Sequence, residues 1–282
     1  MIIPRDLHDI PEWRYIGREA ALARHLIGTG VTALGHANYA DKVGDYYTAF
    51  FGLSIGLERL AKLIFVADYA IDHAGKMPDE MIVRKYGHGL SRLMNAVDVV
   101  GAKYEFKLEY GRPTSSIVVK IVECLDAFAD ASRGRYANFG ALGDPSLGTE
   151  EPVGRWWSDV AEDILAAHFY GKPVEARVRQ QAGLVDAMMS RFSVVLHTDE
   201  KGGAMQDIYT ASFRTGQTVV VQKYGRFYSL TLVRWLCDVL SSISRMAFCD
   251  YNLTPFFGVW EHFYGYRVDD SFLKRRKVWP LV

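Results

Sequence analysis

The chain has 282 residues, and its 49% hydrophobic and 13% aromatic content is enough to bury a sizeable core. This composition excludes a largely disordered protein, because disordered chains are poor in aromatic residues and rich in charge. The 33 basic and 33 acidic residues cancel, so the basic excess of a dedicated nonspecific nucleic-acid binder is absent. We expect one large domain or two closely packed ones.

The three cysteines, Cys124, Cys237 and Cys249, have no spacing typical of a disulfide framework or a zinc site. We expect them to be reduced thiols in a cytoplasmic protein. The N-terminus lacks the basic region and apolar stretch of a signal peptide, and no charge-free apolar run reaches about 20 residues. The sequence therefore predicts no membrane span, and no motif indicates a metal ion or a cofactor.

Helical periodicity dominates the chain and predicts an all-α fold, an up-and-down helical bundle. A short helix is expected over residues 15–26. The strongest signal follows in residues 46–69, where apolar residues recur at alternating spacings of three and four. A helix after Pro113 has Thr114 or Ser115 as its expected N-cap. Further helices are predicted over residues 156–170, 174–197 and 227–249.

Two segments interrupt this helical pattern. The β-branched run Thr218–Val221 favours a short β segment around residues 205–225, with a continuous helix as the alternative. Residues 140–155 are rich in glycine and proline, which makes them the best candidate boundary. We therefore predict a helical bundle over residues 1–140 and a C-terminal helical region over 141–282 packed against it. One continuous domain is the alternative.

Glu58 is a carboxylate at the edge of the wide apolar face of the 46–69 helix. It either pairs with Lys62 four residues later, which is worth a few tenths of a kcal/mol, or anchors a buried polar site. His88 lies between two glycines, four residues before Arg92. It is either a proton carrier near neutral pH or a packing residue at a helix start.

A third polar patch contains Arg133, Arg135, Tyr136 and Asn138. The arginines could hold a phosphate by charge-assisted hydrogen bonds, and the tyrosine could stack on a base. The alternative is a helix junction in which Arg135 pairs with a buried carboxylate such as Glu58.

Three stretches carry a family resemblance: Gly56–Leu63, Gly87–Leu93 and Arg133–Phe139. In this order they resemble the HEPN superfamily of compact helical domains, over residues 40–140. The resemblance implies a bundle that often dimerises. Many members are metal-independent RNases of toxin–antitoxin or antiviral defence systems, and others are noncatalytic modules that bind RNA or protein.

Catalytic members of that superfamily carry an arginine, four to six intervening residues, and a histidine. The third patch has no histidine at this spacing, whereas Arg191 and His197 have five residues between them. Chance placement gives roughly two such pairs in a chain of this composition, so spacing alone carries little weight. The candidate catalytic residues are His88, Arg135, Arg191 and His197. The candidate binding residues are Glu58, Lys62, Arg92, Arg133, Tyr136 and Asn138.

The predicted function is a HEPN-like protein that binds or cleaves RNA, with a metal-independent endoribonuclease as its catalytic version. The alternative is a noncatalytic helical interaction or scaffold protein. A further alternative is an enzyme of another class that uses the C-terminal aromatic residues as a pocket. The expected partners are RNA, a second copy of the chain in a homodimer, or another protein. Each hypothesis about the polar patches requires them to converge in space.

Overall fold

The computed structural model describes residues 7–129 and 152–279, and it confirms the all-α prediction. In chain order, its elements are η1 (Leu7–Asp9), α1 (Pro11–Leu34), α2 (Val43–Asp72), α3 (Glu80–Lys85), α4 (Leu90–Lys103), α5 (Ser116–Ala129), α6 (Pro152–Arg155), the π-helical η5 (Trp156–Ala161), α7 (Glu162–His168), α8 (Pro173–Met189), β1 (His197–Thr198), β2 (Ala204–Met205), α9 (Ile208–Cys249), η6 (Thr254–Phe256), η7 (Val259–Tyr266) and α10 (Asp270–Arg275).

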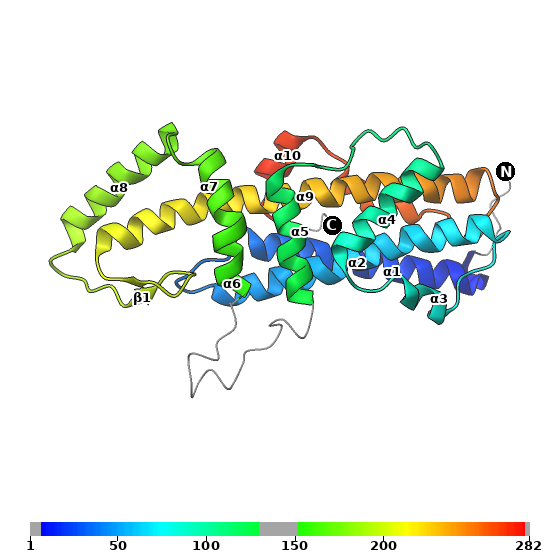
Figure 1. Cartoon of the computed structure of the whole chain (residues 1–282), viewed down its shortest axis with the longest axis horizontal. Coiled ribbons are helices and arrows are strands. Elements are labelled where there is room, and N and C mark those ends of the chain that lie inside the picture. The colour runs from blue at the N-terminus through cyan, green and yellow to red at the C-terminus, as the bar shows by residue number, and fades with distance from the viewer. Residues whose placement is uncertain (1–6, 130–151, 280–282) are drawn as a thin grey trace, which may run out of the picture.

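Three long helices, α1, α2 and α9, run along the long axis of the molecule, and α4, α5 and α7 cross them (Figure 1). Helix α9 packs against both α1 and α2, while η7 and α10 pack against α9. Buried side chains from both parts of the chain form one hydrophobic cluster, which includes Leu53 of α2, Trp156 of η5 and Leu236 of α9. The core is therefore built around the three long helices.

The crossing of α1 and α2 depends on glycine. A Cβ atom on Gly52 would lie 2.7 Å from the carbonyl oxygen of Leu26, and one on Gly30 would lie 2.9 Å from the amide nitrogen of Leu53. A Cβ on Gly56 would meet Ile27 at 2.6 Å. The two backbones are therefore in direct contact, and any side chain at these positions would force the helices apart.

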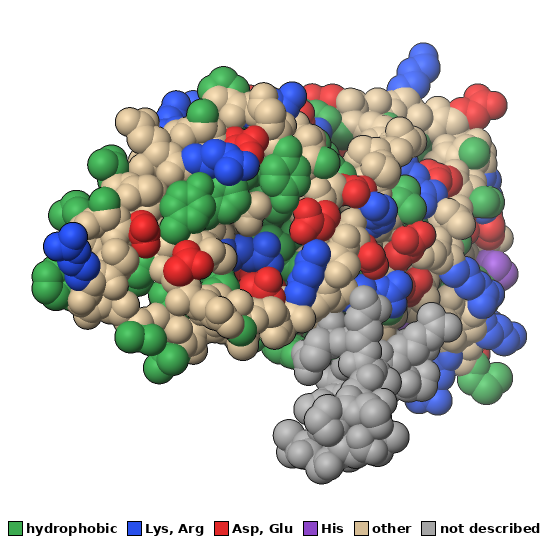
Figure 2. Space-filling model, turned by 60° about the vertical axis from the view of Figure 1, so that its left-hand side comes forward, with side chains coloured by type: hydrophobic (Ala, Val, Ile, Leu, Met, Phe, Trp, Pro, Cys, Tyr) green, Lys and Arg blue, Asp and Glu red, His purple; other side chains and the backbone are tan. Residues whose placement is uncertain are grey.

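Helix α9 is longer than the body of the molecule. Its 42 residues correspond to about 63 Å at 1.5 Å per residue. The first residue of α9 that is buried is Gln217, and the preceding turns pack mainly against α8 (Figure 1). We call the projecting part, residues 173–196 and 208–219, the arm. Hydrophobic side chains gather on the surface at this end of the molecule (Figure 2).

Residues 208–225 belong to helix α9, so the prediction of a β segment there is wrong and the alternative of a continuous helix is correct. In the described residues, strand structure is limited to the short antiparallel pair of β1 and β2. Asp207 caps α9 by accepting a hydrogen bond from the amide of Thr210 at 2.7 Å. Val220 and Val221 are buried in the core. Tertiary burial and the cap therefore override the β preference of the valines.

The prediction of one helix over residues 174–197 is wrong at its C-terminal end, because α8 ends at Met189. The chain then turns through Arg191 and Phe192 and continues without helical hydrogen bonding into β1. Val194 and Leu196 in this stretch are 82% and 89% exposed, so no buried apolar face stabilises a helix here. The Ser115 N-cap prediction is confirmed, since its hydroxyl accepts a hydrogen bond from the amide of Val118 at 3.4 Å.

Within residues 7–129 and 152–279, no helix combines the length and apolar composition that crossing a bilayer requires.

Replacing Gly52 by alanine should separate α1 from α2, because the new methyl group has no room beside the Leu26 carbonyl. We expect the free energy of unfolding to fall by about 1–3 kcal/mol. Gly17, a helical glycine of α1, is the matched control, since a Cβ there meets nothing within 4 Å. Gly17→Ala should raise the free energy of unfolding by up to about 1 kcal/mol. Urea denaturation measures both, and equal effects of the same sign would refute the close crossing.

Candidate functional site

Glu58, Lys62 and His88 come together in the structure. Oε1 of Glu58 lies 2.7 Å from Nζ of Lys62 and 2.9 Å from Nδ1 of His88. The side chains of Glu58 and Lys62 are mostly covered, whereas that of His88 is 78% exposed. Glu58 therefore forms the i,i+4 pair with Lys62, and it also bridges to His88 in the segment before α4.

The local fold that places His88 is well defined. Gly87 has a φ of +77°, a conformation that favours glycine, and it turns the chain away from α3. Asp126 of α5 then caps α4 by accepting hydrogen bonds from the amides of Leu90 at 2.6 Å and Ser91 at 3.2 Å. His88 is thus presented at a fixed helix start beside Glu58, as an exposed imidazole next to a carboxylate.

The remaining predicted residues do not extend this cluster. Arg92 is exposed on α4 and forms no ion pair within the described part of the chain. Arg191 lies in the turn after α8, and His197 is an exposed residue of β1 whose ring contacts that of Tyr39 edge to face. The expectation that both lie late in one helix is therefore wrong. The other four predicted residues, Arg133, Arg135, Tyr136 and Asn138, lie outside the described residues.

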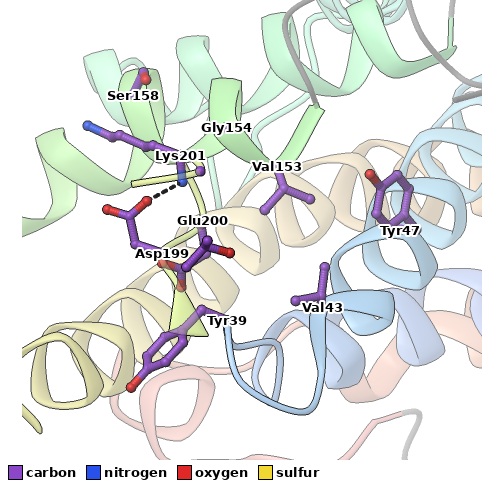
Figure 3. A pocket seen from close by; sticks show the side chains of 11 residues that line it. Tyr39, Val43, Tyr47, Val153, Gly154, Ser158, Asp199, Glu200 and Lys201 are labelled. Carbon is purple, nitrogen blue, oxygen red and sulfur yellow. Dashed lines mark hydrogen bonds between the residues drawn. The ribbon is translucent and has the colours of Figure 1, made fainter. Parts of the chain in front are cut away.

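A pocket of about 480 Å³ lies where three separate segments meet (Figure 3). Tyr39 borders it from the loop before α2, and Val43 from the first residue of α2. Ser158 comes from the π-helical turn η5, and Asp199 and Glu200 come from the loop between β1 and β2. Isolated π-helical turns are rare and often accompany functional sites. This pocket is therefore the second candidate site.

Beneath this loop lies a buried polar network. The indole Nε1 of Trp157 donates to the hydroxyl of Tyr46 at 2.9 Å, and that hydroxyl donates to Oε1 of Glu200 at 3.3 Å. Nε of Arg214 donates to Oε2 of Glu200 at 2.9 Å. The Arg214 guanidinium also stacks 3.7 Å from the Trp157 ring centre. The Glu200 side chain is fully buried, and that of Arg214 is 11% exposed.

The network is strongly perturbed by its burial. Burial raises the pKa of the Glu200 carboxyl above its ordinary value, and the positive charge of Arg214 opposes this shift. Burial and then the charge of Glu200 raise the pKa of Tyr46. Nη2 of Arg214 is buried and has no hydrogen-bond partner among the described residues. Both oxygens of Glu200 are already bonded, so this group joins α2, η5 and α9 rather than facing a substrate.

No sequence signal identified this network, because its members are up to 168 positions apart, counted from Tyr46 to Arg214. Only folding brings them together, and none sits in a recognisable motif. Within the described ranges, no three His, Cys, Asp or Glu side chains are close enough to hold a metal ion. Comparison of the chain with models of protein families, with curated proteins and with solved structures found no match.

Glu200 should make stability depend on pH. The pKa of the Glu200 carboxyl is raised on folding, so the folded chain binds a proton at Glu200 more tightly than the unfolded chain does. Protonation of Glu200 therefore contributes to stability at low pH, and this contribution is lost as the pH rises through the folded-state pKa. The variant Glu200→Gln carries no such titration. We expect the unfolding free energy of wild type minus that of the variant to decrease as the pH rises above the ordinary pKa of a glutamate.

Urea denaturation at a series of pH values measures this difference. Glu80→Gln on α3, where the carboxylate is exposed, is the control for a change of net charge alone. A difference for Glu200→Gln that stays constant over the whole pH range would contradict the prediction.

Proposed function

We propose that the protein is a noncatalytic helical interaction protein that docks another polypeptide on its arm. The observation that carries this proposal is a concentration of exposed apolar side chains, with exposed fractions between 42% and 89%. They are Leu184, Val185, Met188, Met189, Phe192, Val194, Leu196 and Val219. Scattered exposed apolar residues are ordinary, but a contiguous group of this kind marks an interaction surface.

The arm also provides a shaped seat for a partner. A groove of about 520 Å³ runs between α8 and α9, with Val178 and Ala182 among the lining residues from α8 and Val219 from α9. Gly216 keeps the two helices close, because a Cβ there would lie 2.3 Å from Val178. An apolar helix or extended segment fits such a groove by the helix-in-groove mode of recognition.

Two of the exposed side chains, Leu184 and Met188, lie on a different face of α8 from the side chains that hold the arm together. Val178 and Ala182 are buried and fasten α8 to α9, whereas Leu184 and Met188 are 60% and 71% exposed. A helix needs its buried face to stay folded, and it does not need an apolar outer face. The exposed apolar side chains therefore lower the solubility of the protein and do not stabilise its fold, as expected of a binding surface.

The double substitution Leu184→Lys with Met188→Lys tests this separation. We expect the unfolding free energy to change by less than about 0.5 kcal/mol, because both positions are on the surface. Binding of a hydrophobic dye should fall. The matched control is Ala182→Lys on the same helix, which buries a charge and should unfold α8, as hydrogen exchange would show. Loss of α8 in the double variant would refute the proposal, since these side chains would then belong to the fold.

RNA binding is the second candidate, and one observation favours it. The ring of His168 on α7 stacks on that of Tyr224 on α9, with centres 3.6 Å apart. Burial and then the charges of Lys274, Lys223 and Lys172 lower the pKa of His168. Aromatic side chains on which bases can stack, beside positively charged residues, are typical of single-stranded nucleic-acid binding. RNA cleavage and a defence role remain predictions of the family resemblance, and a cytoplasmic location remains a prediction from the cysteine pattern.

Fluorescence anisotropy with a labelled single-stranded RNA tests this candidate. Lys223→Glu and Lys274→Glu should each weaken binding, and each should reduce the dependence of log K on log salt by about 0.7. Lys85→Glu on α3 is the control at the other end of the molecule (Figure 1). Equal weakening by all three variants would indicate only a nonspecific charge effect.

A further inference from the structure

We infer that the partner of the arm is an acidic amphipathic helix of another polypeptide. Its apolar face lies in the groove between α8 and α9, and its carboxylates meet the arginines at the two ends of α8. This inference rests on the proposed function, because it names the chemistry of the partner that the arm docks. The arm lies outside residues 40–140, which carry the family resemblance, and the inference uses only the charge and packing of the groove.

One exposed row of side chains on α8 borders the groove. Its four members follow one another at spacings of four, three and four residues, which places them on one face of the helix: Arg177, Gln181, Leu184 and Met188. All four are exposed, and Gln181 and Leu184 line the groove itself. Arg177 stands at the end of the row nearer the body, and Arg191 follows in the turn after the helix (Figure 1).

The two arginines are available to a partner. Neither Arg177 nor Arg191 forms an ion pair with another residue in the ranges 7–129 and 152–279, and both are exposed. Charged groups around the rim of an apolar contact select a partner of opposite charge and raise its rate of association. The positions of these two cations therefore favour a partner with carboxylates on either side of its apolar face.

The acidic residues of α8 point away from this row. Asp186 is two residues from both Leu184 and Met188, and at about 100° per residue this places it on the opposite side of the helix. Glu175 stands in the same relation to Arg177, and it is already held in an ion pair on α8. Neither carboxylate therefore neutralises the arginines of the exposed row.

The wall that α9 contributes to the groove is free of acidic residues as well. Residues 208–237 contain no aspartate or glutamate, and the groove is lined from this side by neutral residues such as Ser212, Thr215 and Val219. The groove is thus neutral and partly apolar along its length, with a cation near each end. A helix with apolar side chains at i, i+3, i+4 and i+7 and carboxylates beside them matches both properties.

Other occupants match the groove less well. A second copy of the arm would bring the same arginines toward the same row, and like charges facing each other oppose such a contact. None of the described residues that line the groove is aromatic, so a nucleobase would find no ring to stack on. The combination of charge and lining therefore favours an acidic helix.

Selection from a displayed peptide library tests the charge of the partner. The library holds helical peptides of about 14 residues, or four turns, with leucine at i, i+3, i+4 and i+7 and with Glu, Lys or Gln in equal proportion at the flanking positions. The full wild-type chain should enrich Glu at these positions. The double variant Arg177→Glu with Arg191→Glu should enrich Lys instead, because specificity follows the sign of the facing charge. A merely structural role of the arginines would give loss of binding without this reversal.

Fluorescence anisotropy with the most enriched Glu peptide measures the affinity. Arg177→Glu with Arg191→Glu should raise the Kd by roughly tenfold or more. Raising the salt concentration from about 50 mM to about 500 mM should weaken binding to the wild type. The matched control is Arg84→Glu with Lys85→Glu, two exposed residues of α3 whose exchange changes the net charge equally. This control should leave the Kd unchanged.

The possible failures are distinguishable. Peptides enriched by the wild type without a preference for Glu, or with a preference that survives the arginine exchange, would overturn the acidic partner while docking stands. No enrichment at all, or enrichment that Leu184→Lys with Met188→Lys retains, would overturn docking itself. Self-association of the full chain that this leucine and methionine variant abolishes would assign the groove to a second copy and overturn the acidic partner.

Discussion

The architecture depends on the length of one helix. A helix rises 1.5 Å per residue and does not shorten, so the 42 residues of α9 extend beyond the body that covers their C-terminal part. The N-terminal turns of α9 that project beyond the body are exposed on all sides unless another segment packs on them. Helix α8 folds back against these turns and buries one side of them. The arm is therefore the direct outcome of a continuous helix that is longer than its core, and its outer side has no neighbour among residues 7–129 and 152–279.

The place where α9 leaves the body is held by a polar joint. Arg214 lies in the last turn before the buried part of the helix, and through Glu200 it is connected to Tyr46 of α2 and Trp157 of η5. Breaking a buried ion pair is costly because it leaves one charge without a partner. The joint therefore fixes the direction of the arm, while the glycine crossing of α1 and α2 fixes the body behind it.

The sequence predicts the helices well where one face is buried and has a regular period, as in α2 and α5. It misplaces the end of α8, because exposed apolar residues such as Leu196 continue the pattern without any burial to support a helix. The Glu58 cluster was predictable in part, since i,i+4 spacing already places Lys62 beside the carboxylate. The Glu200 network could not be predicted, because it depends on contacts between α2, η5 and α9 that no local pattern encodes.

The exposed face of α8 has a consequence for the behaviour of the protein at high concentration. A pairing of two copies with two-fold symmetry would close on itself, and assembly would stop at two chains. A contact made at another angle would leave part of the face open on each side, and further chains could add without limit to give filaments or a precipitate. The angle at which the α8 helices of two copies meet would therefore decide whether a complex of two chains or an aggregate forms.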